Sequence, residues 1–264
     1  MQKKIIVVKI GGSTLGNHDT TLEDLVQLQK QGKSLVVVHG GGRVASEWLA
    51  RLGIPTSFVN GLRVTDAESL KVVAAALGGL VNKELVVAIQ ALGGKAVGLS
   101  GCDGNMLWAS IKSPELGYVG EIVAVDPTLL KLLLDAGYMP VVAPISFGSV
   151  EGKIILLNAN GDTAAGEIAA ALAAEKLVFL TDVDGIHDSS GKVLPRLNLV
   201  EARDMLASGV ASGGMVPKIE ASLKALNTAQ VVRIIDGRIS HALLHEITGE
   251  ARQNKSGGTT IVPE

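Results

Sequence analysis

The sequence has 264 residues, enough for one large α/β domain or two closely joined lobes with a buried core. Its formal net charge of -2 provides no basic surface of the kind that sequence-independent nucleic-acid binding requires, so we expect no nucleic-acid partner. The one cysteine, Cys102, excludes an intrachain disulfide and a multi-cysteine metal site and is consistent with a reducing compartment, so we expect a cytoplasmic location.

The N-terminus resembles neither a signal peptide nor an anchor. Its first apolar run, residues 5–8, meets Lys9 too early for a signal-peptide core. No uninterrupted apolar run reaches the roughly 18 residues that a membrane-spanning helix needs. We therefore expect no membrane association.

Short β-branched runs alternate with longer amphipathic stretches, which is typical of strand–helix–strand units around a parallel sheet. Hydrophobic residues make up 47% of the chain and aromatic residues only 3%, so Val, Leu, Ile and Ala must fill the interior. Buried strands are predicted at residues 4–10, 34–40, 95–101, 138–144, 175–183 and 231–237. Apolar residues at helical spacing predict helices at 20–31, 43–53, 66–92, 127–136, 162–174, 199–208 and 216–228.

Two stretches interrupt this alternation. Residues 104–125 and 145–157 contain Gly, Pro and short alternating runs, which predict hairpins that form flaps on one lobe. The organisation of the chain places a lobe boundary near residue 175, and we expect the two halves to share one sheet.

Glycine-rich loops follow the first two predicted strands. The first strand contains Lys9 and leads into Gly11 and Gly12; here Lys9 is either a phosphate-binding cation or an ordinary lysine at a strand end. The second strand ends in three consecutive glycines, including Gly41 and Gly42, just before a helix. Bare amides beside the positive end of a helix suit an anion or a carbonyl group, although a tight turn also uses glycine. Neither loop is a P-loop or a G-x-G-x-x-G motif, so any nucleotide is bound by another scheme.

Two polar residues stand where a small substrate would be recognised. Arg63, in "GLRVTD", offers a planar fork that suits a carboxylate, with an exposed structural arginine as the alternative; Thr65 or Asp66 caps the next helix. Asn158 closes the apolar run "IILL", where its amide is placed to bond a ligand amide or carboxylate.

Charged residues near later elements are further candidates. Asp162 is either a helix N-cap or a functional carboxylate, and Lys218 lies in the first turn of a helix, where a cation opposes the dipole unless an anion compensates it. The strand at 175–183 ends in Thr181 and Asp182, and ligands bind beyond the carboxyl ends of such strands.

Hydrolase and metal motifs are missing from the sequence. We find no G-x-S-x-G elbow, no H-E-x-x-H motif and no ligand cluster among the five histidines, and we expect no protein-bound metal site. His39, at the end of the second strand, is interpreted as a buried structural histidine.

Taken together, the ordered motifs "KIGGS", "VVHGGG", "NGLRVTD", "AVGLSGCDG", "GYVGEI", "LNANGDTAAGEIAAAL", "LTDVDGI", "GGMVPK", "IIDGR" and "GGTTIV" resemble the amino acid kinase family, and most of all its N-acetylglutamate kinases. The resemblance runs from Lys9 to Val262. It implies a three-layer α/β/α sandwich around a mainly parallel open sheet, the carbamate kinase-like fold. It also implies an N-terminal lobe of about residues 1–174 for the acidic substrate and a C-terminal lobe of about residues 175–264 for ATP.

The resemblance also implies roles for individual residues. Lys9 and Lys218 would stabilise the transferring phosphoryl group, and Asp162 would position both lysines. The remaining roles are substrate binding by Gly41, Gly42, Arg63 and Asn158, and nucleotide binding by Gly11, Gly12, Thr181, Asp182 and Gly185.

The reaction that the resemblance implies is Mg²⁺- and ATP-dependent phosphorylation of the γ-carboxylate of N-acetyl-L-glutamate in arginine biosynthesis. A carboxylate is ionised at neutral pH and attacks the γ-phosphorus without a general base, so the reaction requires no catalytic histidine. The pair Gly161 and Asp162 is more typical of the carrier-protein-linked aminoadipate or glutamate kinases of lysine or ornithine biosynthesis, and such a kinase is the alternative function. A ligand-sensing regulator without catalytic activity is a further alternative. Against the carrier-linked reading, "GYVGEI" resembles the acetylglutamate version of the flap.

Oligomeric state follows from the same resemblance. Arginine-inhibited members carry an extra N-terminal helix before the first strand and form hexamers, whereas here the first strand starts within a few residues of Met1. We expect a homodimer that arginine does not inhibit at ordinary concentrations.

Overall fold

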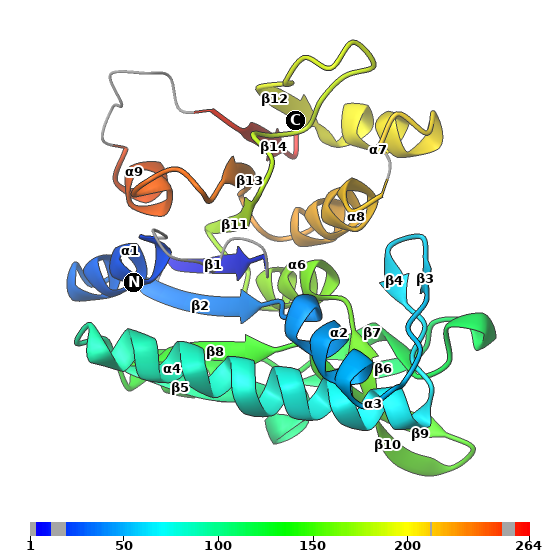
Figure 1. Ribbon diagram of the computed structural model, residues 1–264. Helices are drawn as coiled ribbons and strands as arrows, with labels where there is room; N and C mark the ends of the chain where they lie inside the picture. Colours follow the sequence, from blue (N-terminus) through cyan, green and yellow to red (C-terminus); the bar gives the residue numbers. More distant parts are fainter. Residues whose placement is uncertain (1–3, 12–19, 212, 250–256) are drawn as a thin grey trace.

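The computed structural model describes residues 4–11, 20–211, 213–249 and 257–264. Its central sheet consists of β1 (Ile5–Ile10), β2 (Ser34–His39), β5 (Ala96–Ser100), β8 (Met139–Ala143), β11 (Lys176–Thr181), β12 (Arg196–Asn198), β13 (Val231–Asp236) and β14 (Thr259–Val262). The strand order is β12-β14-β13-β11-β1-β2-β8-β5, and among the described pairings within this sheet only β13 with β14 is antiparallel (Figure 1). The predicted mainly parallel sheet, shared by both halves of the chain, is confirmed.

Helices cover both faces of this sheet, as expected for strands that are apolar on both sides. On one face lie α5 (Thr128–Asp135), α6 (Gly161–Ala171), α7 (Leu199–Ala207) and α8 (Met215–Ala225); on the other lie α1 (Thr21–Lys30), α4 (Asn82–Ala91) and α9 (Ala242–Thr248). Alternation along β1 separates the two cores, because Ile5 and Val7 pack with the first group of helices and Ile6 and Val8 with the second. The three-layer α/β/α architecture is therefore confirmed.

The predicted long helix at 66–92 is present as one continuous helical run in three parts. These are α3 (Ala67–Ala74), a π-helical segment η1 (Ala75–Val81) and α4. Within the described residues it is the one helix long and apolar enough to cross a membrane by length and composition, and 44% of its apolar window is buried in the protein. It packs on α1, β5 and β8, as a helix of the protein core does. The π-helical turn lies beside α2 (Gly42–Arg51).

Two small β structures stand beside the sheet. The predicted hairpins are β6 (Leu107–Ile111) with β7 (Val119–Val125) and β9 (Ile145–Val150) with β10 (Lys153–Ala159), and they close into a four-stranded barrel. A third hairpin, β3 (Phe58–Val59) with β4 (Leu62–Arg63), was not predicted and rises beside the barrel in Figure 1. Its turn residues Asn60 and Gly61 both have positive φ, as in a type I′ turn.

Most other departures from the predicted elements concern short segments. The strands β12 and β14 and the helix α9 have three, four and seven residues and were not predicted. Two 3₁₀ turns, η2 (Asp103–Asn105) and η3 (Pro114–Leu116), lie in the first predicted hairpin region. Such pieces are too short to show a full period of hydrophobic spacing.

Candidate active site

The site residues converge where the two central strands end. β1 is flanked by β2 on one side and by β11 on the other, so the chain order changes direction at β1. Ligands of open α/β sheets bind in the crevice beyond the carboxyl ends of the strands at such a switch point. The ends of β1 and β2 carry Lys9 and the glycines that follow His39, and the first turn of α6 brings Asp162 to the same place.

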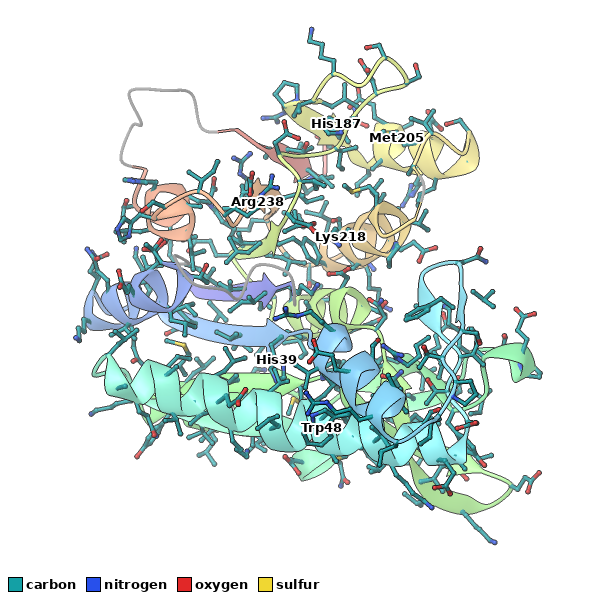
Figure 2. The ribbon with its side chains drawn as sticks, in the orientation of Figure 1. His39, Trp48, His187, Met205, Lys218 and Arg238 are labelled. Carbon is teal, nitrogen blue, oxygen red and sulfur yellow. The ribbon has the colours of Figure 1, made fainter. Side chains whose placement is uncertain are left out.

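A buried carboxylate lies between two lysines from different elements. One oxygen of Asp162, Oδ1, is 2.7 Å from Nζ of Lys9 on β1, and Oδ2 is 3.1 Å from Nζ of Lys218 on α8. The three side chains are between 6% and 13% exposed. Figure 2 shows Lys218 on the helix above the central strands. The structure thus brings together the three predicted catalytic residues, and two cations around one anion leave a net positive charge.

The two lysines control the ionisation of the carboxylate between them. Burial by itself opposes ionisation of Asp162, but the charges and hydrogen bonds of Lys9 and Lys218 outweigh it and hold the pKa of Asp162 below its ordinary value. Asp162 is not the N-cap of α6. That role belongs to Asn160, whose side chain accepts hydrogen bonds from the backbone N–H groups of Asp162 and Thr163.

The glycine loop after β2 is shaped by its packing. Gly41 has a φ of 150°, and a Cβ there would lie 2.4 Å from Cδ2 of Leu77 in the π-helical turn. The positive φ favours glycine at this position, and a side chain here would also push Leu77 aside. The loop therefore presents Gly41 and Gly42 to the cavity in front of β2, as the anion-binding interpretation predicted.

Arg63 is buried with part of its guanidinium unused. Its Nη2 donates to the carbonyl of Gly42 at 3.0 Å and to Oγ of Ser46 at 2.6 Å, while its guanidinium carbon stacks 4.7 Å from the ring centroid of Phe58. Burial lowers the pKa of Arg63 from its high ordinary value. Its Nη1 is buried and makes no hydrogen bond to any described residue. A buried donor without a partner indicates a missing acceptor, so the alternative of an exposed structural arginine is wrong.

Asn158 is tied to Arg63 through one threonine. Nδ2 of Asn158 donates to Oγ1 of Thr65 at 3.1 Å, and that hydroxyl donates to the carbonyl of Arg63 at 2.9 Å. Asp66 caps α3 by accepting from the N–H of Ser69 at 2.7 Å, which decides between the two predicted caps. Thr65 is thereby left to hold both candidate substrate-binding residues.

These residues surround one cavity of about 250 Å³. Its lining includes six of the seven candidates from the catalytic and substrate-binding sets: Lys9, Asp162, Gly41, Gly42, Arg63 and Asn158; Lys218 does not line it and is joined to it through its ion pair with Asp162. This volume is just below the usual range of about 300–1,000 Å³ for small-molecule sites, as suits a small substrate. The arrangement provides a guanidinium at one place, a side-chain amide at another, and a lysine pair with glycine amides where charge would be neutralised.

A larger cavity of about 590 Å³ adjoins the first one. It lies between the β3–β4 hairpin, the barrel and α8, and shares Leu62, Val119 and Asn160 with the smaller cavity. Its charged lining consists of Lys112, Glu115, Glu121 and Glu220. Three carboxylates against one ammonium group repel the negative charges of a polyphosphate. The larger cavity is therefore not assigned as the reaction site on its size.

The structure describes four of the five predicted nucleotide-binding residues. Gly11 ends β1 and its N–H bonds the carbonyl of Leu180 on β11 at 3.1 Å, next to Thr181 and Asp182 at the end of that strand. Gly185 has a φ of 146° and lies against Thr259. Gly12 lies outside the described residues. Neither cavity described above is lined by these residues, so their nucleotide role stays a prediction.

Sequence reasoning missed several supporting side chains of the site. Phe58, which stacks on Arg63, was not singled out, although Asn60 and Gly61 between apolar residues are a strong hairpin signal. Ser46 and Thr65 were not expected to support Arg63, because a contact between separate loops leaves no periodic pattern in the sequence.

The sequence is similar to a known protein family and to individual proteins. The amino acid kinase family matches residues 4–236. An acetylglutamate kinase from Dehalococcoides mccartyi (strain ATCC BAA-2266 / KCTC 15142 / 195) is 46% identical over 261 residues, which cover 98% of this chain and 94% of that protein.

Two solved structures show the same fold. N-acetylglutamate synthase from Neisseria gonorrhoeae, complexed with coenzyme A and N-acetyl-glutamate, has a TM-score of 0.82 and 28% identity; the match covers all of this chain and 60% of that one. Carbamate kinase from Giardia lamblia bound to AMP-PNP has a TM-score of 0.71 at 16% identity, with 98% of both chains covered, and shows the fold alone.

Proposed function

The chain belongs to the amino acid kinase family, and from that premise we propose that it transfers the γ-phosphoryl group of ATP to the side-chain carboxylate of N-acetyl-L-glutamate. The products are N-acetyl-L-glutamyl 5-phosphate and ADP, a step of arginine biosynthesis. The observation that carries the proposal is the 250 Å³ cavity, which Arg63, with its unpartnered Nη1, Lys9 and Asp162 all line, while Lys218 pairs with Asp162 at its edge.

Each end of the substrate has a complementary group. The α-carboxylate accepts from the unpartnered nitrogen of Arg63, and the acylamino group bonds the side-chain amide of Asn158. The γ-carboxylate then lies beside Lys9 and the amides of Gly41 and Gly42. Because three separate groups fix the substrate, its reacting oxygen is held in one orientation.

The chemical step needs no base from the protein. An ionised carboxylate oxygen attacks the γ-phosphorus, the new O–P bond forms, and the bond between the γ-phosphorus and the β,γ-bridging oxygen breaks, leaving ADP. Lys9 and Lys218 offset the charge of the transferred group and Asp162 keeps both ammonium groups in place. Mg²⁺ enters as part of the nucleotide substrate, bound through the phosphates.

The division of the chain into lobes belongs to this proposal. Residues of about 1–174 supply the acidic-substrate cavity, and residues of about 175–264 bind ATP with Thr181, Asp182, Gly185 and the glycines after β1. Lys218, on the C-terminal lobe, pairs with Asp162 of the N-terminal lobe, so the cluster is built from both lobes. We place the enzyme in the cytoplasm, in keeping with its one free cysteine.

We further propose that the enzyme is a homodimer. The strand β5 is one edge of the sheet, and α4 beside it exposes Val87 to 62%, with Leu80 and Leu92 near its ends 37% and 39% exposed. An open sheet edge next to apolar side chains is a surface that a second copy can cover. Light scattering after size exclusion tests this, and a monomeric or hexameric mass would contradict it.

The activity test traps the acyl phosphate as its hydroxamate. With ATP and Mg²⁺, N-acetyl-L-glutamate, free glutamate, N-acetylaspartate and N-acetyl-aminoadipate are compared at equal concentrations. Preference for N-acetyl-L-glutamate is expected, because Asn158 is placed to bond an acylamino group, which free glutamate lacks, and because the distance from Arg63 to Lys9 selects one length of side chain. Activity with none of the four would refute the free-substrate reading and turn attention to a carrier-linked substrate.

A further inference from the structure

His39 and Asn82 form a buried network of hydrogen bonds behind the glycine loop, and neither residue lines the substrate cavity. His39 is fully buried, and its Nδ1 lies 2.6 Å from the carbonyl oxygen of Gly40. Its Nε2 lies 3.1 Å from Nδ2 of Asn82, the residue that follows the π-helical turn. Figure 2 shows His39 between the end of β2 and the long helix. The sequence interpretation of His39 as a buried structural histidine explains its burial but not these bonds.

The donor and acceptor groups of His39, Asn82 and the neighbouring carbonyls determine which atom donates in these hydrogen bonds. A carbonyl oxygen only accepts, so Nδ1 of His39 carries the proton and Nε2 must accept from Asn82. The amide of Asn82 cannot turn over, because Nδ2 also lies 2.8 and 3.2 Å from the carbonyl oxygens of Val141 and Leu99, which only accept; its two N–H groups serve three acceptors, so one of them is shared. Its Oδ1 accepts from Nζ of Lys83 at 3.0 Å. The pKa of His39 is lowered to about 4, first by burial, so the ring is neutral at neutral pH.

The peptide between Gly40 and Gly41 transmits this orientation to the cavity. The described peptides include no cis bond, and in a planar trans peptide the C=O and the following N–H point in opposite directions. When His39 holds the Gly40 carbonyl on the core side, the N–H of Gly41 points toward the cavity that Gly41 lines. Among the described residues this N–H has no hydrogen-bond partner.

We propose that His39 and Asn82 are positioning residues, which hold the Gly40 carbonyl and thereby direct the N–H of Gly41 at the reacting carboxylate of the substrate. The inference rests on the proposed function for the identity of that carboxylate. Glycine, which the positive φ at position 41 favours, has many accessible backbone orientations, so the loop needs an external contact to keep one of them. The histidine supplies that contact from behind, where substrate does not reach it.

The test compares two variants of equal shape. His39→Asn keeps an amide donor near the position of Nδ1, whereas the isosteric His39→Leu has none. We expect kcat to fall about tenfold or more in His39→Leu, with the KM for ATP within about twofold of wild type, and to recover in part in His39→Asn. Leu28→Ala, a fully buried site in α1, is the control: its melting temperature falls while kcat stays near wild type.

Three outcomes would overturn the proposal: wild-type kcat in His39→Leu, equal losses in His39→Leu and His39→Asn, or the same loss in Leu28→Ala. If neither His39 variant folds, ¹⁵N-histidine NMR of the wild-type enzyme at neutral pH decides, since a proton on Nε2 of His39 contradicts the chain of bonds. That spectrum needs no substrate. Failure of wild type to phosphorylate N-acetyl-L-glutamate would therefore refute the proposed function and leave the test of His39 standing.

Discussion

Replacing Asp162 by Asn removes one charge from the cluster without changing the shape of the side chain. Its two oxygens lie 2.7 Å from Lys9 and 3.1 Å from Lys218, so with an effective dielectric constant of about 20 each attraction is worth roughly 5–6 kcal/mol before desolvation. Desolvation offsets most of this gain, but removal of one partner leaves the lysines buried and uncompensated. We expect the free energy of unfolding to fall by about 3–5 kcal/mol.

The same change disturbs the alignment of both lysines. An asparagine oxygen accepts from one ammonium group, but its NH₂ group faces the other, so donor meets donor at that position. The lysine next to the NH₂ group must move away from the place where the transferred phosphoryl group is neutralised. We expect kcat for acyl phosphate formation to fall roughly 10²–10³-fold, the scale found when one stabilising group of a transition state is lost.

A matched control separates catalysis from stability. Glu246 on α9 also joins two cations, Lys176 at 2.8 Å and Arg233 at 2.9 Å, and its side chain is 11% exposed, but it does not line the substrate cavity. Glu246→Gln should lower the melting temperature and leave kcat within about threefold of wild type. Hydroxamate assays and thermal unfolding of both variants are measured together. A kcat near wild type in Asp162→Asn, or equal kcat losses in both variants, would refute the reasoning.

Three further predictions follow from individual side chains. Arg63→Lys loses the planar fork and should raise the KM for N-acetyl-L-glutamate about 10–100-fold with the KM for ATP unchanged, and equal increases in both constants would contradict the assignment. Lys218→Ala should lower kcat by about 10² and change the KM for the acyl substrate little; an unchanged kcat removes Lys218 from the mechanism. The pKa of His39 falls from 6.5 to about 4 on folding, so its neutral ring contributes fully to the free energy of unfolding above pH 6.5. This contribution, about 3 kcal/mol, is lost as the pH falls from 6.5 through 4. Denaturant unfolding of wild type and His39→Leu checks this, and equal pH dependence in both would be evidence against it.

The main elements of the fold could be predicted because their patterns are local. The strands β1, β2 and β11 are short, largely apolar runs, and the long helix through α3 and α4 keeps apolar residues at helical spacing for several turns. The closure of two hairpins into a barrel is different. It depends on the pairings of β10 with β7 and of β6 with β9, between segments that carry no mark of one another in the sequence.

The site was predictable to the extent that its residues follow strand ends or glycines. Lys9, Gly41 and Asn158 could be selected in this way. The roles of Asp162 and Asn160 could not be separated by sequence, because both are good caps and lie two residues apart; only the directions of their side chains decide. The partnership of Arg63 with Phe58 depends on a tight hairpin and on stacking, which one-dimensional spacing does not describe.

The burial of Lys9 decides between its two interpretations. A lysine at an ordinary strand end keeps its ammonium group in water, yet the side chain of Lys9 is 10% exposed and ends 2.7 Å from Asp162. Two cations around one buried carboxylate do not by themselves indicate catalysis, because Glu246 joins Lys176 and Arg233 away from the substrate cavity. Here a second buried cation, Lys218, shares the same carboxylate, so the cluster keeps a net positive charge against a cavity. Desolvated charge of this kind is stable only when something compensates it, and an anionic substrate is the group that does so during the reaction. The feature that distinguishes this cluster from the one at Glu246 is its position, because Lys9 and Asp162 line the substrate cavity and Glu246 does not, and this position supports the proposed role in phosphoryl transfer.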